Sequence, residues 1–198
     1  MNKIVFVTLS SIPPEKLKTV SYAREGNTEN CSSPTKFPGI ALLEHVVRAG
    51  DRVKLVMLYQ TDADSFWKQN REAFLGELGA LSARCGVPLS VSAEIGTPMN
   101  LGREHQIELF RKLCAQYEDE CEVYLDIGSG AKSVSIVMFA SLCYAEKFRL
   151  CNIEGIDLAT PFPPAVYDVR SAYELLMFTG TIDGLSTEDA DRLINDLK

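Results

Sequence analysis

The chain has 198 residues, of which 46% are hydrophobic, enough for one domain with a substantial core, or one domain and a short appendage. Its formal net charge of −7, with no compensating basic block, argues against broad electrostatic binding of DNA or RNA. The longest apolar run, around residues 134–143, is too short to span a bilayer, and the N-terminus lacks the features of a signal peptide. We therefore expect a cytoplasmic protein without membrane segments.

Strands and helices are predicted to alternate along the chain. Five strands are predicted. Apolar runs predict buried strands at residues 3–9 and 52–59, alternation of apolar and polar residues predicts one at 89–95, and further strands are expected at 121–127 and 149–158. Helical periodicity and end signals predict a helix after each of the first four strands, over residues 38–49, 62–84, 103–117 and 132–147. This alternation is typical of a mostly parallel sheet with helices on both faces, so we expect a Rossmann-like α/β fold.

One segment interrupts the alternation between the first strand and the first helix. Residues 18–24 and 31–37 flank a turn at Gly26-Asn27 and predict an exposed β-hairpin, inserted at about residues 18–37. We also consider that this hairpin could close over a ligand as a flap.

The C-terminal part of the chain is predicted to lie outside the main domain, which we place at residues 1–160. The tract Thr160-Pro-Phe-Pro-Pro-Ala165 predicts a rigid, extended connector. Helices are expected after it, over residues 169–179 and 187–197, so residues 161–198 form a connector with C-terminal helices.

The cysteines and histidines indicate no metal site. Six cysteines show neither a Cys-x-x-Cys pair nor a zinc-like spacing, and we expect reduced structural thiols. With only His45 and His105, a histidine-based metal site is not expected; His45 is expected on a helix face. We predict no metal and no cofactor.

The most informative segment surrounds a Gly-Ser-Gly turn. An apolar strand ends at Asp126, the turn follows, and Lys132 and Ser133 begin an apolar helix. Unpaired N–H groups and the positive end of the helix dipole make such a turn a favourable anion site. Lys132 adds a charge and Ser133 a hydroxyl. The segment therefore predicts recognition of phosphate, most simply on a nucleotide; the alternative is a tight βα turn whose glycines serve geometry alone.

Three common motifs do not fit this turn. A Walker A loop has Lys-Ser/Thr directly after its second glycine, whereas Ala131 separates Gly130 from Lys132. A Rossmann fingerprint would need a third glycine where Ser133 stands, and the Gly-x-Ser-x-Gly spacing of a nucleophile elbow is absent. In parallel α/β sheets ligands bind beyond the carboxyl ends of the strands, so this turn and residues 8–11 should form one ligand floor.

At this turn the sequence resembles a known family. Asp126-Ile-Gly-Ser-Gly-Ala-Lys-Ser133 resembles the Asp-Ile-Thr-x-Gly-x-Lys/Arg-Ser signature of the CRISPR-associated Rossmann fold (CARF) domains, the cyclic oligoadenylate sensors of type III CRISPR immunity. Further segments are similar to the hairpin, first helix and exit segment of the CARF branch usually fused to HEPN ribonucleases: Val20-Ser-Tyr22, Gly26, Thr35-Lys-Phe-Pro38, Ala41-Leu-Leu-Glu-His45 and Ala165-Val-Tyr-Asp-Val169. The resemblance covers nearly the whole chain, although Gly128 departs from it where the signature usually has Thr.

The resemblance implies a ligand site and a quaternary structure. Its two ligand-binding turns correspond to Leu9, Ser10, Ser11, Gly128, Ser129, Gly130, Ala131, Lys132 and Ser133. CARF domains pair as symmetric homodimers with the cyclic ligand on the two-fold axis, so Lys132 of each subunit would face phosphates. Many of them carry an effector. No HEPN-type Arg–His pair follows the connector, so a further effector domain or partner protein would have to supply that activity.

Three functions stay open on this reading. The first, placed slightly ahead, is a dimeric sensor that binds cyclic oligoadenylate, with the tetra-adenylate as the expected ring. The second is a metal-independent ring nuclease, in which the ribose 2′-OH attacks the adjacent phosphate, Lys132 stabilises the developing charge and Ser11 orients the hydroxyl. The third is an unrelated, monomeric Rossmann-like enzyme for a mononucleotide or phosphorylated metabolite. If the hairpin is a flap, Tyr22 or Arg24 could close on the adenines.

Overall fold

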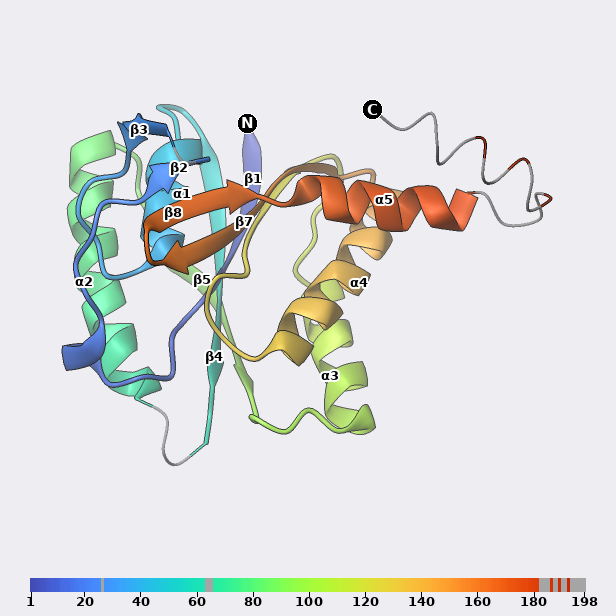
Figure 1. The fold of residues 1–198 in the computed structure, drawn as a ribbon, viewed down its shortest axis with the longest axis horizontal. Coiled ribbons are helices and arrows are strands. Elements are labelled where there is room, and N and C mark those ends of the chain that lie inside the picture. Colours follow the sequence, from blue (N-terminus) through green and yellow to red (C-terminus); the bar gives the residue numbers. More distant parts are fainter. Residues whose placement is uncertain (26, 63–65, 182–185, 187–188, 190–191, 193–198) are drawn as a thin grey trace.

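The computed structural model describes residues 1–25, 27–62, 66–181, 186, 189 and 192. It is an α/β fold in which one mixed sheet carries helices on both faces, as expected (Figure 1). The strands are β1 Asn2–Thr8, β2 Ala23–Arg24, β3 Asn27–Cys31, β4 Arg52–Gln60, β5 Val91–Thr97, β6 Glu122–Asp126, β7 Asn152–Pro161 and β8 Pro164–Asp168. The helices are the short 3₁₀ helix Pro14–Lys16, α1 Pro38–Val46, α2 Trp67–Cys85, α3 Arg103–Cys114, α4 Lys132–Arg149 and α5 Arg170–Thr181.

The central strands are parallel, and their order in the sheet reverses at one switch point. The sheet order is β3-β2-β8-β7-β6-β1-β4-β5, and β5, β4, β1, β6 and β7 are parallel. From β1 the chain proceeds outward through β4 to β5, and then returns to the other side of β1 for β6 and β7. The switch in strand order therefore lies between β1 and β6, which is where ligands bind in open α/β sheets.

The core has two layers, one on each face of the sheet. Along β1, Ile4 and Phe6 pack against α3 and α4, whereas Val5 and Val7 pack against α1 and α2. This burial on both faces explains why the strand is apolar without a break. Figure 1 shows α1 and α2 together on one side of the sheet and α3 and α4 on the other.

The connector prediction was wrong. Residues 160–165 do not leave the sheet: β7 runs to Pro161 and turns back, through a cis Phe162–Pro163 peptide, into the antiparallel strand β8. Ala165 and Val166 are buried, so this segment belongs to the sheet and not to a linker. The helix expected next is α5, and the one expected at residues 187–197 lies outside the described residues apart from positions 189 and 192.

The N-terminal hairpin forms, but it is part of the sheet. It consists of β2 and β3, with an outer bridge between Val20 and Thr35, and β2 pairs in parallel with β8. Tyr22 and Ala23 are each 8% exposed, so β2 is buried at these positions, whereas the described residues of β3 are exposed as expected. The hairpin is held because β8 offers it a partner strand that the sequence did not reveal.

Several helix ends differ from expectation. Asp62 does not cap α2, which begins at Trp67; its side chain instead accepts a hydrogen bond from the Met99 N–H. Helix α1 ends at Val46, before the predicted stop at Gly50. No disulfide joins any of the six cysteines, all of which the structure describes. No helix among the described residues combines the length and apolarity needed to cross a bilayer.

Candidate functional site

The two turns singled out in the sequence lie side by side at the switch between β1 and β6. Thr8, the last residue of β1, connects them: its Oγ1 donates to the Asp126 carbonyl (3.2 Å) and accepts from the Ser129 N–H (3.1 Å). Leu9 continues the parallel ladder by donating to Leu58 O (2.8 Å). The single hydroxyl of Thr8 therefore joins the two turns into one structural unit.

The second turn presents unpaired backbone donors. Helix α4 begins at Lys132, and its N-cap, Ala131, makes no side-chain capping bond. Within the described structure no acceptor is found for the N–H groups of residues 130–133. Gly130 has a φ of 106°, a conformation that a side chain would strain. Lys132 is exposed at the same helix end, so donors and a positive charge gather where an anion would be stabilised.

The first turn is held from below by a residue that the sequence analysis missed. Asn70 of α2 is fully buried, and its Nδ2 donates to Ser10 O (2.7 Å) and Ile12 O (2.9 Å). Phe66 N–H also donates to Ser11 O (3.4 Å). The side chains of Ser10 and Ser11 are half-buried, but that of Leu9 is 2% exposed, so only the backbone of Leu9 could meet a ligand.

Beneath the second turn lies a buried carboxyl group. Asp126 Oδ1 accepts the Gly128 N–H at 2.8 Å, whereas Oδ2 has no partner among the described residues. Burial, and secondarily the charge of Asp157, raise the pKa of Asp126 to about 7. The group supports the turn from within the protein and is not in contact with solvent.

The departure at position 128 from the CARF signature has a steric explanation. A Cβ on Gly128 would lie 2.8 Å from the Ala159 Cβ and 3.1 Å from Asp126 Oδ1. Separations below 3 Å are not tolerated without movement of one group. A threonine therefore does not fit this turn as it stands against β7.

Tyr22 and Arg24, the hairpin residues considered as a flap, contact the sheet instead of the two turns. The Arg24 guanidinium forms a bidentate pair with Asp157 of β7, with Nη–Oδ distances of 2.9 and 3.1 Å, and the side chain of Tyr22 is buried. Arg24 and Tyr22 therefore form part of the fold, and the structure does not support their closing over the turns.

The β7–β8 hairpin instead supplies an unpredicted wall beside the turns. Asp126, the last residue of β6, pairs with Asp157, and β7 continues for four residues beyond it to Pro161. At the tip, Phe162 is 71% exposed, and Lys18 Nζ lies 4.6 Å from the centre of its ring. A free aromatic face with an adjacent cation is a suitable platform for a base.

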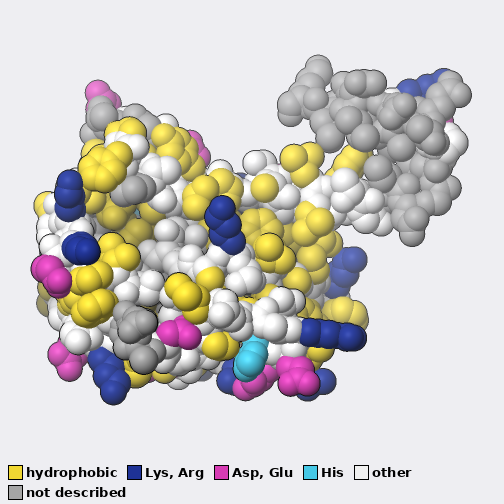
Figure 2. Space-filling view, turned by 60° about the horizontal axis from the view of Figure 1, so that its bottom comes forward, with side chains coloured by type: hydrophobic (Ala, Val, Ile, Leu, Met, Phe, Trp, Pro, Cys, Tyr) yellow, Lys and Arg dark blue, Asp and Glu magenta, His cyan; other side chains and the backbone are white. Residues whose placement is uncertain are grey.

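Basic side chains are scattered over this side of the molecule. Figure 2 turns towards the reader the side on which β4 and β5 end, and there the Lys and Arg side chains are dispersed among hydrophobic, neutral and acidic groups. This distribution suits a small anionic ligand better than a long nucleic acid. No group of three or more His, Cys, Asp or Glu side chains in the described part of the chain could hold a metal ion.

No protein-family model matches this chain, and no curated protein matches it either.

Proposed function

We propose that this protein is a dimeric sensor that binds cyclic oligoadenylate, with the tetra-adenylate as the expected ring. The observation that carries the proposal is the junction of the two turns by Thr8 at the strand-order switch, beside the four unpaired N–H groups of residues 130–133. Such a surface is suited to a phosphodiester. The ligand class and the dimer come from the resemblance to CARF domains.

In this proposal each part of the site meets a different part of the ligand. The N–H groups at the start of α4 and the Lys132 ammonium bind phosphate oxygens, and Ser10 and Ser11 offer hydroxyls to the ribose. Phe162 stacks on an adenine, because its ring is exposed at the tip of the wall formed by β7 and β8. A symmetric dimer would double this set around a ligand that has its own rotational symmetry.

The ring nuclease is the second candidate function, since the same turns place Lys132 and Ser133 at a helix N-terminus. Cleavage would require an in-line geometry of the 2′-OH and the phosphate, with Lys132 stabilising charge and Ser11 orienting the hydroxyl. The turns contain no histidine or carboxylate that reaches solvent, so any turnover without a general base should be slow.

Native mass spectrometry with cyclic tetra-adenylate, followed for hours in a metal-free buffer, tests the proposal. A dimer carrying one intact ring supports the sensor, and conversion to linear di-adenylate with a cyclic phosphate end supports the nuclease. One mononucleotide per monomer would instead indicate the unrelated enzyme. Failure to bind any ring size would contradict both CARF-like functions.

Lys132→Ala tests the site itself. Loss of a charge-assisted contact from each subunit should weaken ring binding by roughly 10- to 100-fold. Lys147→Ala is the matched control, because Lys147 is an exposed lysine near the other end of the same helix. Equal affinity of the two variants would remove the assignment of the turn as the ligand site.

A further inference from the structure

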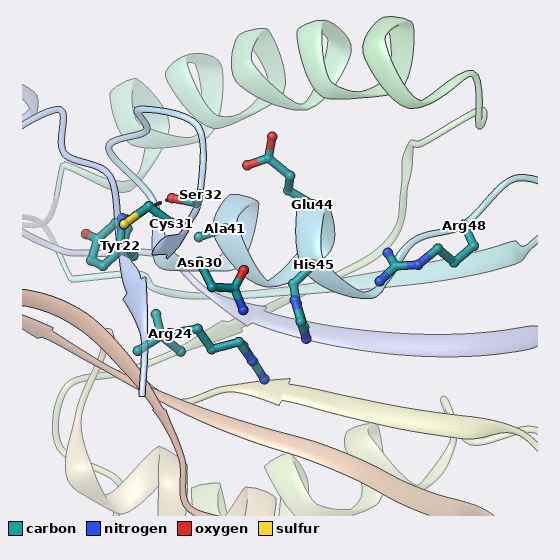
Figure 3. A pocket seen from close by; sticks show the side chains of 10 residues that line it. Tyr22, Arg24, Asn30, Cys31, Ser32, Ala41, Glu44, His45 and Arg48 are labelled. Carbon is teal, nitrogen blue, oxygen red and sulfur yellow. Dashed lines mark hydrogen bonds between the residues drawn. The ribbon is translucent and has the colours of Figure 1, made fainter. Parts of the chain in front are cut away.

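A cavity of about 150 Å³ lies between the N-terminal hairpin and α1, away from the two turns (Figure 3). Arg24 and Asn30 enter it from the hairpin, His45 from the last turn of α1, and Arg48 from the segment that follows this helix. Gly39, in the first turn of α1, lies beside Asp126. His45 follows six residues later, about 9 Å farther along the helix axis, so the cavity is separate from the strand-end site.

The basic groups of this cavity outnumber its acidic groups. Glu44 is the one carboxylate that lines it, and Glu44 already accepts from the N–H and hydroxyl of Ser33 and pairs with Arg84 at 3.1 Å. Arg24 pairs with Asp157. Arg48 makes no ion pair with any described carboxylate; its Nη1 donates only to Val47 O.

We propose that this cavity is a second binding site, for a small tetrahedral oxyanion of the size of phosphate, held by Arg48, His45 and the outer edge of Arg24. Two arginines and an imidazole border a space of about 150 Å³, which is large enough for such an anion and a few waters. Asn30 lines the hairpin side and can donate a further hydrogen bond through its side-chain amide, whereas the Ser32 hydroxyl already donates to Ser33 O.

The protonation of His45 can report whether an anion is bound in the cavity. Burial, followed by the charges of Arg24 and Arg48, lowers the pKa of His45, so the imidazole is held neutral among cations. An anion that joined these groups would favour the imidazolium and raise that pKa, and binding would strengthen as the pH falls. The remaining charged or titratable groups here are Glu44, Tyr22 and Cys31 in the cavity, and Lys3, Glu122, Tyr124 and Glu154 in an adjoining hollow of about 290 Å³ that shares Arg24, His45 and Arg48.

The adjoining acidic groups are already engaged. Glu122 lies 3.7 Å from Lys3 Nζ and accepts from the Tyr124 hydroxyl, and Glu154 lies 3.9 Å from Arg170. Asp51, which accepts the Arg48 backbone N–H at 2.7 Å, pairs with Lys3 at 2.7 Å. No ion pair to the Arg48 guanidinium is found within the described structure.

An NMR titration of the two histidine rings tests the proposal. The His45 and His105 resonances are followed from pH 5 to pH 8 in sodium chloride and in sodium sulfate at equal ionic strength, so that general screening is the same in both. Sulfate should raise the pKa of His45 by roughly one unit above its value in chloride and leave that of His105 unchanged. An equal His45 pKa in both salts, or an equal movement of both histidines, would overturn the proposal.

Arg48→Gln and Arg103→Gln form a matched pair. Both arginines are exposed, but Arg103 lies on α3, beside His105 and outside the cavity. Arg48→Gln should abolish the sulfate response of His45, whereas Arg103→Gln should retain it. If both variants keep the response, or both lose it, the cavity is not the anion site.

Discussion

Replacing Asp126 by Asn should stabilise the protein much more at pH 8 than at pH 5. Asp126 is fully buried, and its pKa is raised from 3.8 to about 7 in the folded state. Because the folded-state pKa lies above the unfolded-state value, the folded protein holds a proton that the unfolded chain has released between these two values. Raising the pH through this window therefore lowers the free energy of unfolding of the wild type. Asn carries no charge to lose.

The size of the effect follows from the two pKa values. With 3.8 in the unfolded chain and about 7 in the fold, the wild type should lose about 2.5 kcal/mol relative to the variant between pH 5 and pH 8. For a protein of this length that corresponds to a difference in Tm of about 5–10 °C. Asn keeps an oxygen that can accept the Gly128 N–H, and its amide hydrogens occupy the side where Oδ2 has no partner.

The measurement is thermal unfolding of wild type and Asp126→Asn at pH 5, 6, 7 and 8, with the difference in Tm plotted against pH. Asp119→Asn is the control, because the Asp119 side chain is 71% exposed and its removal should leave the pH profile of the wild type unchanged. If the difference between Asp126→Asn and wild type is the same at every pH, Asp126 is ionised throughout and the argument from burial is wrong.

Three further substitutions, one of them paired with a control, test contacts that support the sheet and the two turns. Arg24→Met should cost about 3–5 kcal/mol in urea denaturation, because it leaves the buried Asp157 carboxylate unpaired; a loss below about 1 kcal/mol would contradict this account. Gly128→Ala should destabilise by about 1–3 kcal/mol through the clash with β7, whereas Gly76→Ala, with open space around it, should stabilise by about 0.5–1 kcal/mol. Asn70→Ala should cost about 1–3 kcal/mol and speed amide hydrogen exchange in residues 8–12; unchanged exchange there would show that Asn70 does not hold the first turn.

The parallel part of the sheet could be predicted because its signal is local. Ile4, Val5, Phe6 and Val7 form an unbroken apolar run, and only a strand covered on both faces buries all four. The start of α4 could be predicted for the same reason. Gly130, Ala131 and Lys132 are adjacent in sequence, and together they place the helix N-terminus and leave it without a side-chain cap.

The β7–β8 hairpin could not be predicted in the same way. Pro161, Pro163 and Pro164 are typical of a connector. Pro161 and Pro164 nevertheless lie in strands, because β7 pairs with β8 and β2 lies alongside β8, and Pro163 lies in the turn between them. Strand β2 is distant in sequence from β8, and the local sequence of β7 and β8 fits an extended connector as well as a hairpin. The wall and its exposed Phe162 were therefore missed.

The sequence by itself determined the order of the parallel strands and their helices, the apolar faces of the core and the position of the Gly-Ser-Gly turn at the start of α4, because each depends on residues that are neighbours in the chain. Only the tertiary structure decided that Thr8 joins this turn to the first, that Asn70 and Asp126 support the two turns from the interior, and that Arg24 is held by Asp157. Hydrogen bonds and pKa values of buried groups depend on which distant side chains exclude water from them, and that arrangement exists only once the sheet has assembled.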